Sequence, residues 1–126
     1  MSTIDVNQKT VIRLIVAGSR GFSDYQTLRK KLDFYAQNYK TVEIVSGTAK
    51  GADQLGERYA QEKGYAVKRF PANWEKYGNQ AGLIRNEQMA KYASHAVLFW
   101  DGVSKGTLSM VRLCKQYNLN YRIVKF

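Results

Sequence analysis

Five short apolar runs alternate with amphipathic patterns of helical spacing along the chain, and this alternation limits the folds that are open to it. The apolar runs have the length and composition of buried strands and cover residues 11–17, 42–45, 66–70, 95–100 and 121–124. The helical patterns cover residues 25–39, 51–63, 83–92 and 105–117. Strands that alternate with helices form right-handed βαβ units and a parallel sheet covered on both faces. We therefore predict a three-layer α/β sandwich with five parallel strands in the order 3-2-1-4-5.

The chain is long enough for one domain with a single hydrophobic core. Its 126 residues are 44% hydrophobic, and we expect a polar segment over residues 1–10 and one domain over residues 11–126. The polar start lacks the apolar core of a signal peptide, and no apolar stretch is long enough to span a membrane. The single cysteine, Cys114, lies in a helical pattern and is expected to be a buried, inert thiol. A lone cysteine fits a reducing compartment, so we expect a cytoplasmic protein.

The formal net charge of the chain is +10, from 20 Lys and Arg residues against 10 Asp and Glu residues. A positive field of this size attracts polyanions, phosphates and acidic ligands. The positive residues are dispersed along the sequence and do not form the basic block of a recognition helix. Solvated helix faces explain most of them, so nucleic-acid binding is kept as an alternative rather than as the main function.

Small and polar residues follow the apolar runs at the points where strands are expected to end. In an open parallel sheet the carboxyl ends of the strands converge on one crevice, which is where ligands bind. Glycines let a ligand approach the backbone there, and helix N-termini present unpaired N–H groups to an anion. The candidate ligand-binding residues are Gly18, Ser19, Arg20, Ser46, Gly47, Thr48, Gly51, Ala52, Asp53, Arg85, Asn86, Trp100, Asp101, Gly102, Ser104, Gly106 and Thr107. The pattern predicts a nucleotide or phosphate site, although neither the Walker A motif nor the GxGxxG dinucleotide fingerprint occurs.

Two arginines are the main candidates for holding a phosphate. Arg20 directly follows the first strand, where it could pair with a phosphate through two hydrogen bonds; a solvated turn residue is the alternative. Arg85 lies near a helix start, where it could clamp a phosphate while Asn86 reads a base edge or bonds a ribose. A surface ion pair with a neighbouring glutamate is the alternative for Arg85, but such pairs contribute little stability.

Residues 46–53 would bring backbone N–H groups and two hydroxyls to a helix start, which is a suitable cradle for an anion. Capping of that helix by Ser or Thr is the structural interpretation of the same residues. Asp53 lies in the first turn, where a carboxylate interacts favourably with the helix dipole; a hydrogen bond to a ribose hydroxyl is the second interpretation. We favour the structural role for Asp53.

Residues 72–82 form the least regular stretch, and we expect an irregular connection there. Trp74 and Tyr77 within it could stack on a base as a lid over the crevice, or pack against the domain. His95 opens the fourth strand at the end away from the crevice and is expected to be structural. No cluster of His, Cys and Asp has metal-ligand spacing, and no Ser–His or Cys–His signature occurs, so neither a metal nor another cofactor is predicted.

Five strings occur in order at the expected strand ends: GSRGF, SGTAKGAD, FPANW, AGLIRNEQM and WDGVSKGT. Together they resemble the SLOG superfamily, specifically its YspA/YpsA-related branch, over nearly the whole chain from Val11 onward. The resemblance implies a Rossmann-like fold, so that residues 11–126 form a single SLOG-like nucleotide-binding domain of bacterial or phage type. The superfamily also includes the cytokinin-activating phosphoribohydrolases, often called lysine decarboxylase-like, and the DNA-processing DprA proteins. By this resemblance Arg85 and Asn86 occupy the place of an Arg-containing motif that is functional in the phosphoribohydrolases, which makes Arg85 the strongest single candidate. Relatives commonly form dimers or tetramers, which makes a homo-oligomer an expectation here.

The fourth-strand loop departs from the catalytic pattern of the phosphoribohydrolases. Their motif PGGxGTxxE, aligned on Gly106 and Thr107, puts Met110 at the position of the catalytic glutamate. A thioether cannot act as a general acid or base, so this resemblance disfavours phosphoribohydrolase activity. Asp101 or Glu87 could substitute, although nothing in the sequence aims either of them at a glycosidic bond.

We therefore expect a protein that binds a nucleotide-derived small molecule, such as a nucleoside phosphate, an ADP-ribose-like compound or a cyclic nucleotide. It would serve as a sensor or a sequestering protein. One alternative is a hydrolase of an N-glycosidic or phosphate bond of such a ligand. The second alternative, from the DprA relatives and the +10 charge, is a protein that binds single-stranded nucleic acid.

Overall fold

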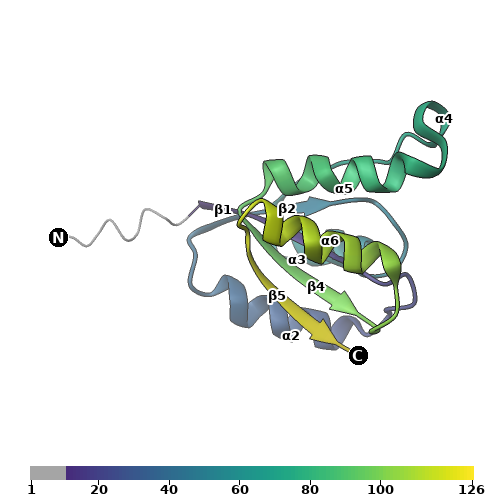
Figure 1. The fold of residues 1–126 in the computed structure, drawn as a ribbon. Helices are drawn as coiled ribbons and strands as arrows, with labels where there is room; N and C mark the ends of the chain where they lie inside the picture. Colours follow the sequence, from purple (N-terminus) through teal and green to yellow (C-terminus); the bar gives the residue numbers. More distant parts are fainter. Residues whose placement is uncertain (1–10) are drawn as a thin grey trace.

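A computed structural model of the chain describes residues 11–126, so the expected polar segment over residues 1–10 lies outside the described part. Its sheet has five strands, all parallel, in the order β3-β2-β1-β4-β5 (Figure 1). The strands are β1 (Val11–Gly18), β2 (Thr41–Ser46), β3 (Ala66–Arg69), β4 (His95–Trp100) and β5 (Asn120–Lys125). The helices are α2 (Tyr25–Ala36), α3 (Ala52–Lys63), α4 (Trp74–Tyr77), α5 (Ala81–Tyr92) and α6 (Lys105–Gln116), with a 3-10 turn over Gly78–Gln80. The predicted Rossmann-like α/β fold and strand order are confirmed.

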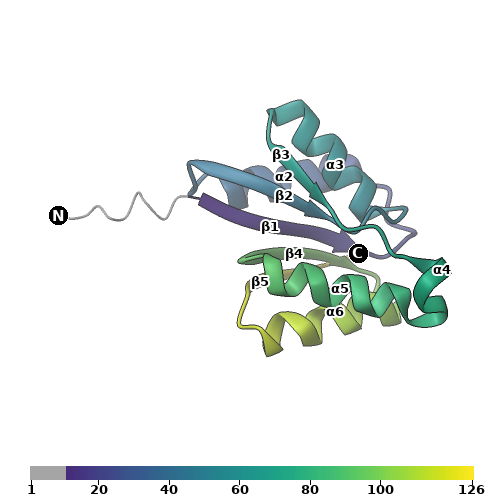
Figure 2. The same ribbon diagram turned by 90° about the horizontal axis from the view of Figure 1, so that it is seen from above.

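The helices cover both faces of the sheet, as the view from above shows (Figure 2). Helices α2 and α3 pack on one face, where Leu28 and Tyr59 meet buried strand residues such as Val16. Helices α5 and α6 pack on the other face, where Met89 and Met110 belong to a second buried cluster. Continuous apolar strands are needed because both faces are covered, and β1 and β4 have them.

The connection predicted to be irregular contains a short helix, α4, so that prediction is wrong for residues 74–77. The Asn73 side chain accepts a hydrogen bond from the backbone N–H of Lys76 at 3.1 Å, which caps the single helical turn. Gly78, with a φ of +56°, ends it. Helix α5 then begins at Ala81, two positions before the predicted start, and α4 projects beyond the end of the sheet (Figure 1).

Three further sequence expectations concern Cys114, His95 and membrane spans. Cys114 is a buried free thiol whose pKa is raised to about 11 by burial, which makes it a weak nucleophile. His95 packs edge-on against the rings of Tyr35 and Tyr39. In residues 11–126 no helix is long and apolar enough to cross a membrane.

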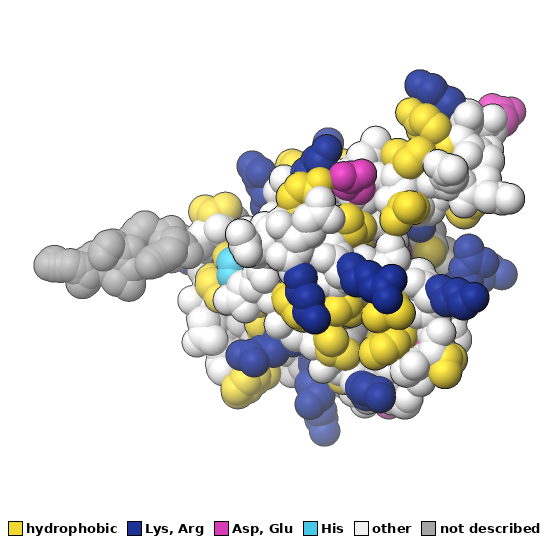
Figure 3. Space-filling view, in the orientation of Figure 1, with side chains coloured by type: hydrophobic (Ala, Val, Ile, Leu, Met, Phe, Trp, Pro, Cys, Tyr) yellow, Lys and Arg dark blue, Asp and Glu magenta, His cyan; other side chains and the backbone are white. Residues whose placement is uncertain are grey.

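The face over α6 and β5 is seen in Figure 3. Its Lys and Arg side chains surround a hydrophobic patch, and the Asp and Glu side chains that are visible lie mostly over α5 and α4.

Candidate functional site

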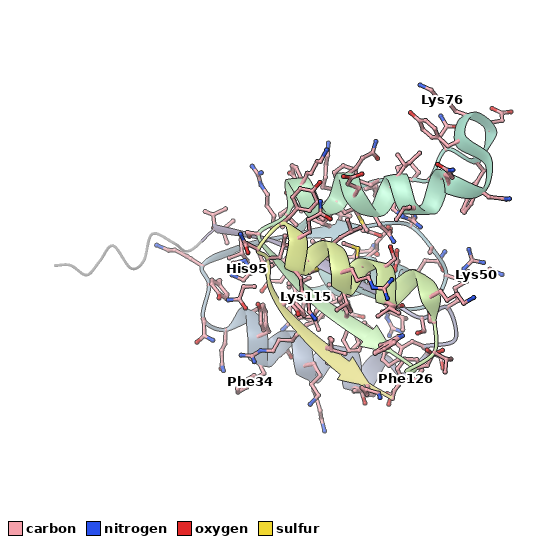
Figure 4. The ribbon with its side chains drawn as sticks, viewed as in Figure 1. Phe34, Lys50, Lys76, His95, Lys115 and Phe126 are labelled. Carbon is pink, nitrogen blue, oxygen red and sulfur yellow. The ribbon has the colours of Figure 1, made fainter. Side chains whose placement is uncertain are left out.

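A cleft of about 670 Å³ opens at the carboxyl ends of β1 and β4, the strands between which the strand order reverses. This is the position at which open α/β sheets bind ligands. Eleven of the predicted site and lid residues line it: Gly18, Ser19, Arg20, Asp53, Trp74, Arg85, Asn86, Asp101, Ser104, Gly106 and Thr107. His95 lies at the opposite end of the molecule from Lys50, which belongs to the loop after β2 (Figure 4).

The two strand-end loops that form the base of the cleft are fastened together by hydrogen bonds. The backbone N–H of Ser19 donates to the carbonyl of Phe99 at 2.9 Å, and the N–H of Asp101 donates to the Ser19 hydroxyl at 3.2 Å. A Cβ on Gly18 would lie only 2.1 Å from the Phe99 carbonyl oxygen, so the backbones approach more closely than any side chain allows. These contacts fix the base of the cleft before any ligand enters.

The loop after β2 shapes the cleft without contributing most of its lining. The buried Ser46 hydroxyl donates to Glu57 at 2.6 Å and accepts from the backbone N–H of Thr48 at 3.0 Å, which holds Thr48 at a φ of +64°. Gly51 has a φ of +85°, and a Cβ there would lie 2.5 Å from the Ser19 carbonyl oxygen. These contacts set the geometry of the loop. The predicted site residues of this loop that do not line the cleft are Ser46, Gly47, Thr48, Gly51 and Ala52.

Arg85 reaches from α5 across the cleft to this loop. Its Nη1 donates to the backbone carbonyl of Gly47, and its Nε donates to the Asn86 side-chain oxygen at 2.9 Å. The expected alternative, an ion pair with a neighbouring glutamate, is not what the structure has. Glu87 instead accepts a hydrogen bond from Tyr117 at 2.7 Å and pairs with Lys91 at 3.9 Å. Glu87 does not line the cleft.

Asp53 is an almost fully buried carboxyl group, 4% exposed, at the start of α3. It accepts a hydrogen bond from the backbone N–H of Ala49 at 3.4 Å, and a Cβ on Gly47 would lie 2.7 Å from its Oδ2. Burial raises the pKa of Asp53 to about 6, while the Ala49 hydrogen bond and the charge of Arg85 oppose the rise. The carboxyl group thus organises the loop and also lines the cleft.

Two guanidinium groups approach the same space. Burial lowers the pKa of Arg85; Asp53 opposes this effect and the nearby charge of Arg20 adds to it. Arg20 is exposed at the end of β1 and lines the cleft. An anion bound between the two arginines would relieve their repulsion.

The loop after β4 supplies the opposite wall of the cleft. Asp101 Oδ1 accepts hydrogen bonds from the backbone N–H groups of Val103 at 2.9 Å and Ser104 at 2.8 Å, and these bonds lower the pKa of Asp101. The first turn of α6 follows at once, so Lys105, Gly106 and Thr107 reach the cleft at the positive end of a helix dipole. Trp100 and Gly102 do not line the cleft; the Trp100 indole donates to the Ser104 carbonyl at 3.0 Å.

The two proposed lid residues differ in their position. Trp74 lines the cleft and is 53% exposed, and its Cη2 atom would lie 3.5 Å from a Cβ on Gly82. Tyr77 does not line the cleft. Residues that were not among the candidate ligand-binding or lid residues complete the lining: Ala17, Gly21, Ala49, Gly82, Leu83, Lys105, Ser109 and Met110.

The donor set of the cleft suits an anion with hydroxyl groups. Cationic and N–H donors come from β1, α5 and α6, and the Asp53 carboxyl group supplies one buried acceptor. Among residues 11–126 no group of three His, Cys, Asp or Glu side chains could hold a metal ion. Met110, buried in the wall at 2% exposure, offers no group for proton transfer.

Comparisons of the sequence with known proteins give two matches. A model of the YspA, cpYpsA-related SLOG family matches residues 12–77, from β1 to the end of α4. The chain is also similar to the Gene 61 protein of Mycobacterium phage D29, with 32% identity over 108 residues that cover 79% of this chain and 86% of that protein.

Two solved structures have a similar fold. DNA processing protein A (DprA) from Streptococcus pneumoniae matches 91% of this chain with a TM-score of 0.70 and 16% identity, over 50% of its own chain. DNA processing protein A from Helicobacter pylori, in a structure that concerns its single-stranded DNA binding mode, matches 91% of this chain with a TM-score of 0.63 and 18% identity, over 66% of its own chain. The present chain therefore spans half to about two thirds of these structures, and at these identities the likeness concerns the fold.

Proposed function

The chain belongs to the YspA, cpYpsA-related SLOG family, and from this premise we propose that it binds a nucleotide-derived small molecule in the cleft between β1 and β4. The ligand class comprises nucleoside phosphates, ADP-ribose-like compounds and cyclic nucleotides. The protein would act as a sensor of such a compound or would sequester it.

One observation carries this proposal: two arginines face one cleft and neither guanidinium is neutralised there by an ion pair. The hydrogen bonds of Arg85 go to neutral oxygens, those of Gly47 and Asn86, which orient the group. The charge of Asp53 acts on Arg85, but the two side chains form no ion pair. Arg20 faces the same cleft, and Lys105 stands at the first turn of α6 on the opposite wall. A phosphate group is the anion that such a planar, preorganised arrangement of donors binds best.

Binding is supported better than catalysis by the acids near the cleft. The Oδ1 atom of Asp101 already accepts two backbone hydrogen bonds, and Glu87 is engaged with Tyr117 outside the cleft. Met110 stands where the phosphoribohydrolase resemblance expects a glutamate. Asp53 is the remaining carboxyl group in the lining, and its position behind Gly47 supports a structural role or a hydrogen bond to a ribose hydroxyl.

Calorimetric titration of the purified protein with nucleoside monophosphates, ADP-ribose, cyclic nucleotides and ribose 5-phosphate tests the proposal. We expect at least one of them to bind, and Arg85→Gln to weaken that binding at least tenfold. Arg29→Gln removes one positive charge from the exposed surface of α2 and is the matched control. The absence of binding to the whole panel, or an equal loss in both variants, contradicts the proposal.

A second candidate function is the binding of single-stranded DNA. The similar fold of the Helicobacter pylori protein and the net charge of +10 favour it. Titration with a labelled oligonucleotide at increasing salt separates it from the first, because each phosphate contact to a single strand contributes about −0.7 to the slope of log Kobs against log salt. A mononucleotide makes few phosphate contacts, so its log Kobs falls much less steeply with log salt.

A further inference from the structure

Half of the net charge of +10 falls in the last fifth of the sequence, although Lys and Arg residues occur along the whole chain. The last 25 residues, 102–126, contain five Lys and Arg residues and no Asp or Glu. These residues form α6, β5, the loop between them and the part of the loop before α6 that follows Asp101. All five cations are exposed: Lys105, Arg112, Lys115, Arg122 and Lys125.

Four of these cations lie on one surface, which we call the α6–β5 face and define by Lys105, Arg112, Lys115, Ile123 and Lys125. The spacing of seven and then three residues puts the first three on one side of α6, along about 15 Å of helix. The register of β5 with β4 pairs Ile123 with Leu98 and Lys125 with Trp100. Leu98 belongs to the cluster under α5 and α6, so Ile123 and Lys125 face the α6 side of the sheet.

Figure 3 looks onto this face, and dark blue side chains surround a hydrophobic patch there. Figure 4 labels Lys115 on α6, near β5 in that view. Ile123, at 40% exposure, contributes an apolar side chain to the face.

The cations of the α6–β5 face are not neutralised by ion pairs of the described chain. In residues 11–126 the four ion pairs involve Arg58, Lys63, Arg69 and Lys91. Lys125 instead lies 5.6 Å from the centre of the Trp100 ring. The acids that compensate positive charge elsewhere lie on α2, α3 and α5, so the field over α6 and β5 stays positive and favours an anionic partner.

We propose that the α6–β5 face binds the phosphate backbone of a single-stranded nucleic acid. Lys105 belongs both to the cleft and to the row along α6, so the row leads directly out of the cleft. A strand with one nucleotide in the cleft would continue along α6 past Arg112 and Lys115. A single strand fits this path because a base in a duplex must first be unpaired and unstacked to enter a cleft of about 670 Å³.

A second copy of this chain does not suit the face in a symmetric contact, because its own α6–β5 face carries the same charge and repels it. The inference deepens the second candidate function and rests on it. It assigns the binding to a surface that extends beyond the cleft.

The test compares two triple variants that remove the same charge. Arg112→Gln, Lys115→Gln and Lys125→Gln remove three of the four cations of the α6–β5 face and leave Lys105, which lines the cleft. Arg29→Gln, Lys30→Gln and Lys31→Gln neutralise three exposed cations of α2 and are the matched control. Gln, Lys and Arg have similar helix propensities, and Lys125 is exposed on the edge strand β5, so both variants should fold. Binding of a fluorescein-labelled 20-nucleotide oligo-dT is measured by anisotropy from 50 to 200 mM salt.

We expect the slope of log Kobs against log salt to become about 2 units shallower in the α6–β5 variant, since three phosphate contacts contribute about 0.7 each. The control variant should keep a slope close to that of the wild type. Equal changes in both variants mean that only net charge matters and overturn the proposal. A wild type that does not bind the oligonucleotide overturns it together with the second candidate function.

Two further measurements distinguish binding at the α6–β5 face from binding in the cleft, and a nucleic acid from an acidic protein as the partner. Arg85→Gln should weaken mononucleotide binding and leave the effect of the α6–β5 variant on oligo-dT intact. If the wild type binds a mononucleotide but the α6–β5 variant binds oligo-dT as well as the wild type does, this inference is overturned and the proposed nucleotide binding in the cleft is not. If polyglutamate of equal charge competes as well as unlabelled oligo-dT, the face is a site for an acidic protein, and the proposal for nucleic acid fails.

Discussion

The guanidinium group of Arg85 donates a hydrogen bond to the backbone carbonyl of Gly47, which lies 38 positions earlier in the chain. Its Nε is held at the same time by the neighbouring Asn86 side chain at 2.9 Å. Helix α5 and the loop after β2 are thus joined across the cleft by one side chain. Two fixed hydrogen bonds orient the planar group before a ligand arrives, which lowers the entropy that binding must remove.

Arg85→Lys should separate this geometry from charge alone. A lysine keeps the positive charge but cannot donate in a plane to two acceptors and to a phosphate. We expect at least a tenfold loss in affinity for the nucleotide ligand, about 1.4 kcal/mol, and a loss of about 1–3 kcal/mol in the free energy of unfolding. Titration calorimetry and urea unfolding measure the two effects. Arg29→Lys on the exposed surface of α2 should change neither the affinity nor the stability. If Arg85→Lys also changes neither, the planar geometry of the Arg85 guanidinium group does not matter for binding.

Gly47 occupies the space between two charged side chains. A Cβ at this position would lie 2.7 Å from Asp53 Oδ2 and 3.0 Å from Arg85 Nη1. Gly47→Ala must therefore push both groups apart, and we expect it to lower the free energy of unfolding by about 1–3 kcal/mol and to weaken ligand binding. Chemical unfolding and calorimetry test this.

Gly106→Ala is the matched comparison for stability. A Cβ on Gly106 meets no heavy atom within 4 Å, and the residue lies in the first turn of α6. Alanine has the higher helix propensity, so the variant should be as stable as the wild type or more stable by up to about 1 kcal/mol. An equal loss in both variants would mean that the contacts of Gly47 do not matter.

The fold follows from local patterns, whereas the cleft depends on contacts that no local pattern encodes. The parallel sheet between two layers of helices was predictable because continuous apolar runs such as residues 11–17 need cover on both faces. Asn73 and Gly78 are a recognisable cap and stop for α4, but one turn is too short to give a periodic signal.

Long-range contacts explain what sequence reasoning missed in the site. Arg20 and Arg85 were identifiable from their residue type and their place at element ends. The bond from Arg85 to Gly47 and the one from Ser46 to Glu57 depend on how α5 and α3 pack. Lys105 and Leu83 reach the cleft because of the direction in which their helices run. In the sequence, Lys105 stands within the string WDGVSKGT, between the candidates Ser104 and Gly106, and this was the sign that it belonged to the site.

Asp53 should make the stability of the protein depend on pH between about 4 and 6. Burial raises its pKa to about 6 in the folded protein, while an unfolded aspartate titrates near pH 3.9. Between these values the folded state binds more protons, so the stability from this group is fully present below about pH 4 and is lost as pH rises through about 6. Asp53→Asn removes the titration, and its stability relative to the wild type should rise over this window by as much as about 3 kcal/mol.

Urea unfolding at several pH values from 4 to 7 measures that difference. His95, whose pKa is lowered by burial, titrates in both proteins and therefore cancels on subtraction. Asp24→Asn gives a control of opposite sign, because hydrogen bonds from Thr27 lower the pKa of Asp24 and its contribution is lost as pH falls. If the difference in the free energy of unfolding between Asp53→Asn and the wild type does not change from pH 4 to 7, burial does not raise the pKa of Asp53.

Trp74 should report a base in the cleft, since it lines the cleft while Tyr77 does not. Its indole is 53% exposed and lies over the first turn of α5 near Gly82. Stacking of a base on it would quench its fluorescence, and Trp74→Ala should weaken nucleotide binding by about 1–3 kcal/mol, the usual contribution of such stacking. Ribose 5-phosphate, which has no base, should bind Trp74→Ala and the wild type equally. Tyr77→Ala is the control and should bind the nucleotide with the affinity of the wild type. If Trp74→Ala loses as much affinity for ribose 5-phosphate as for the nucleotide, Trp74 shapes the cleft without stacking on the base.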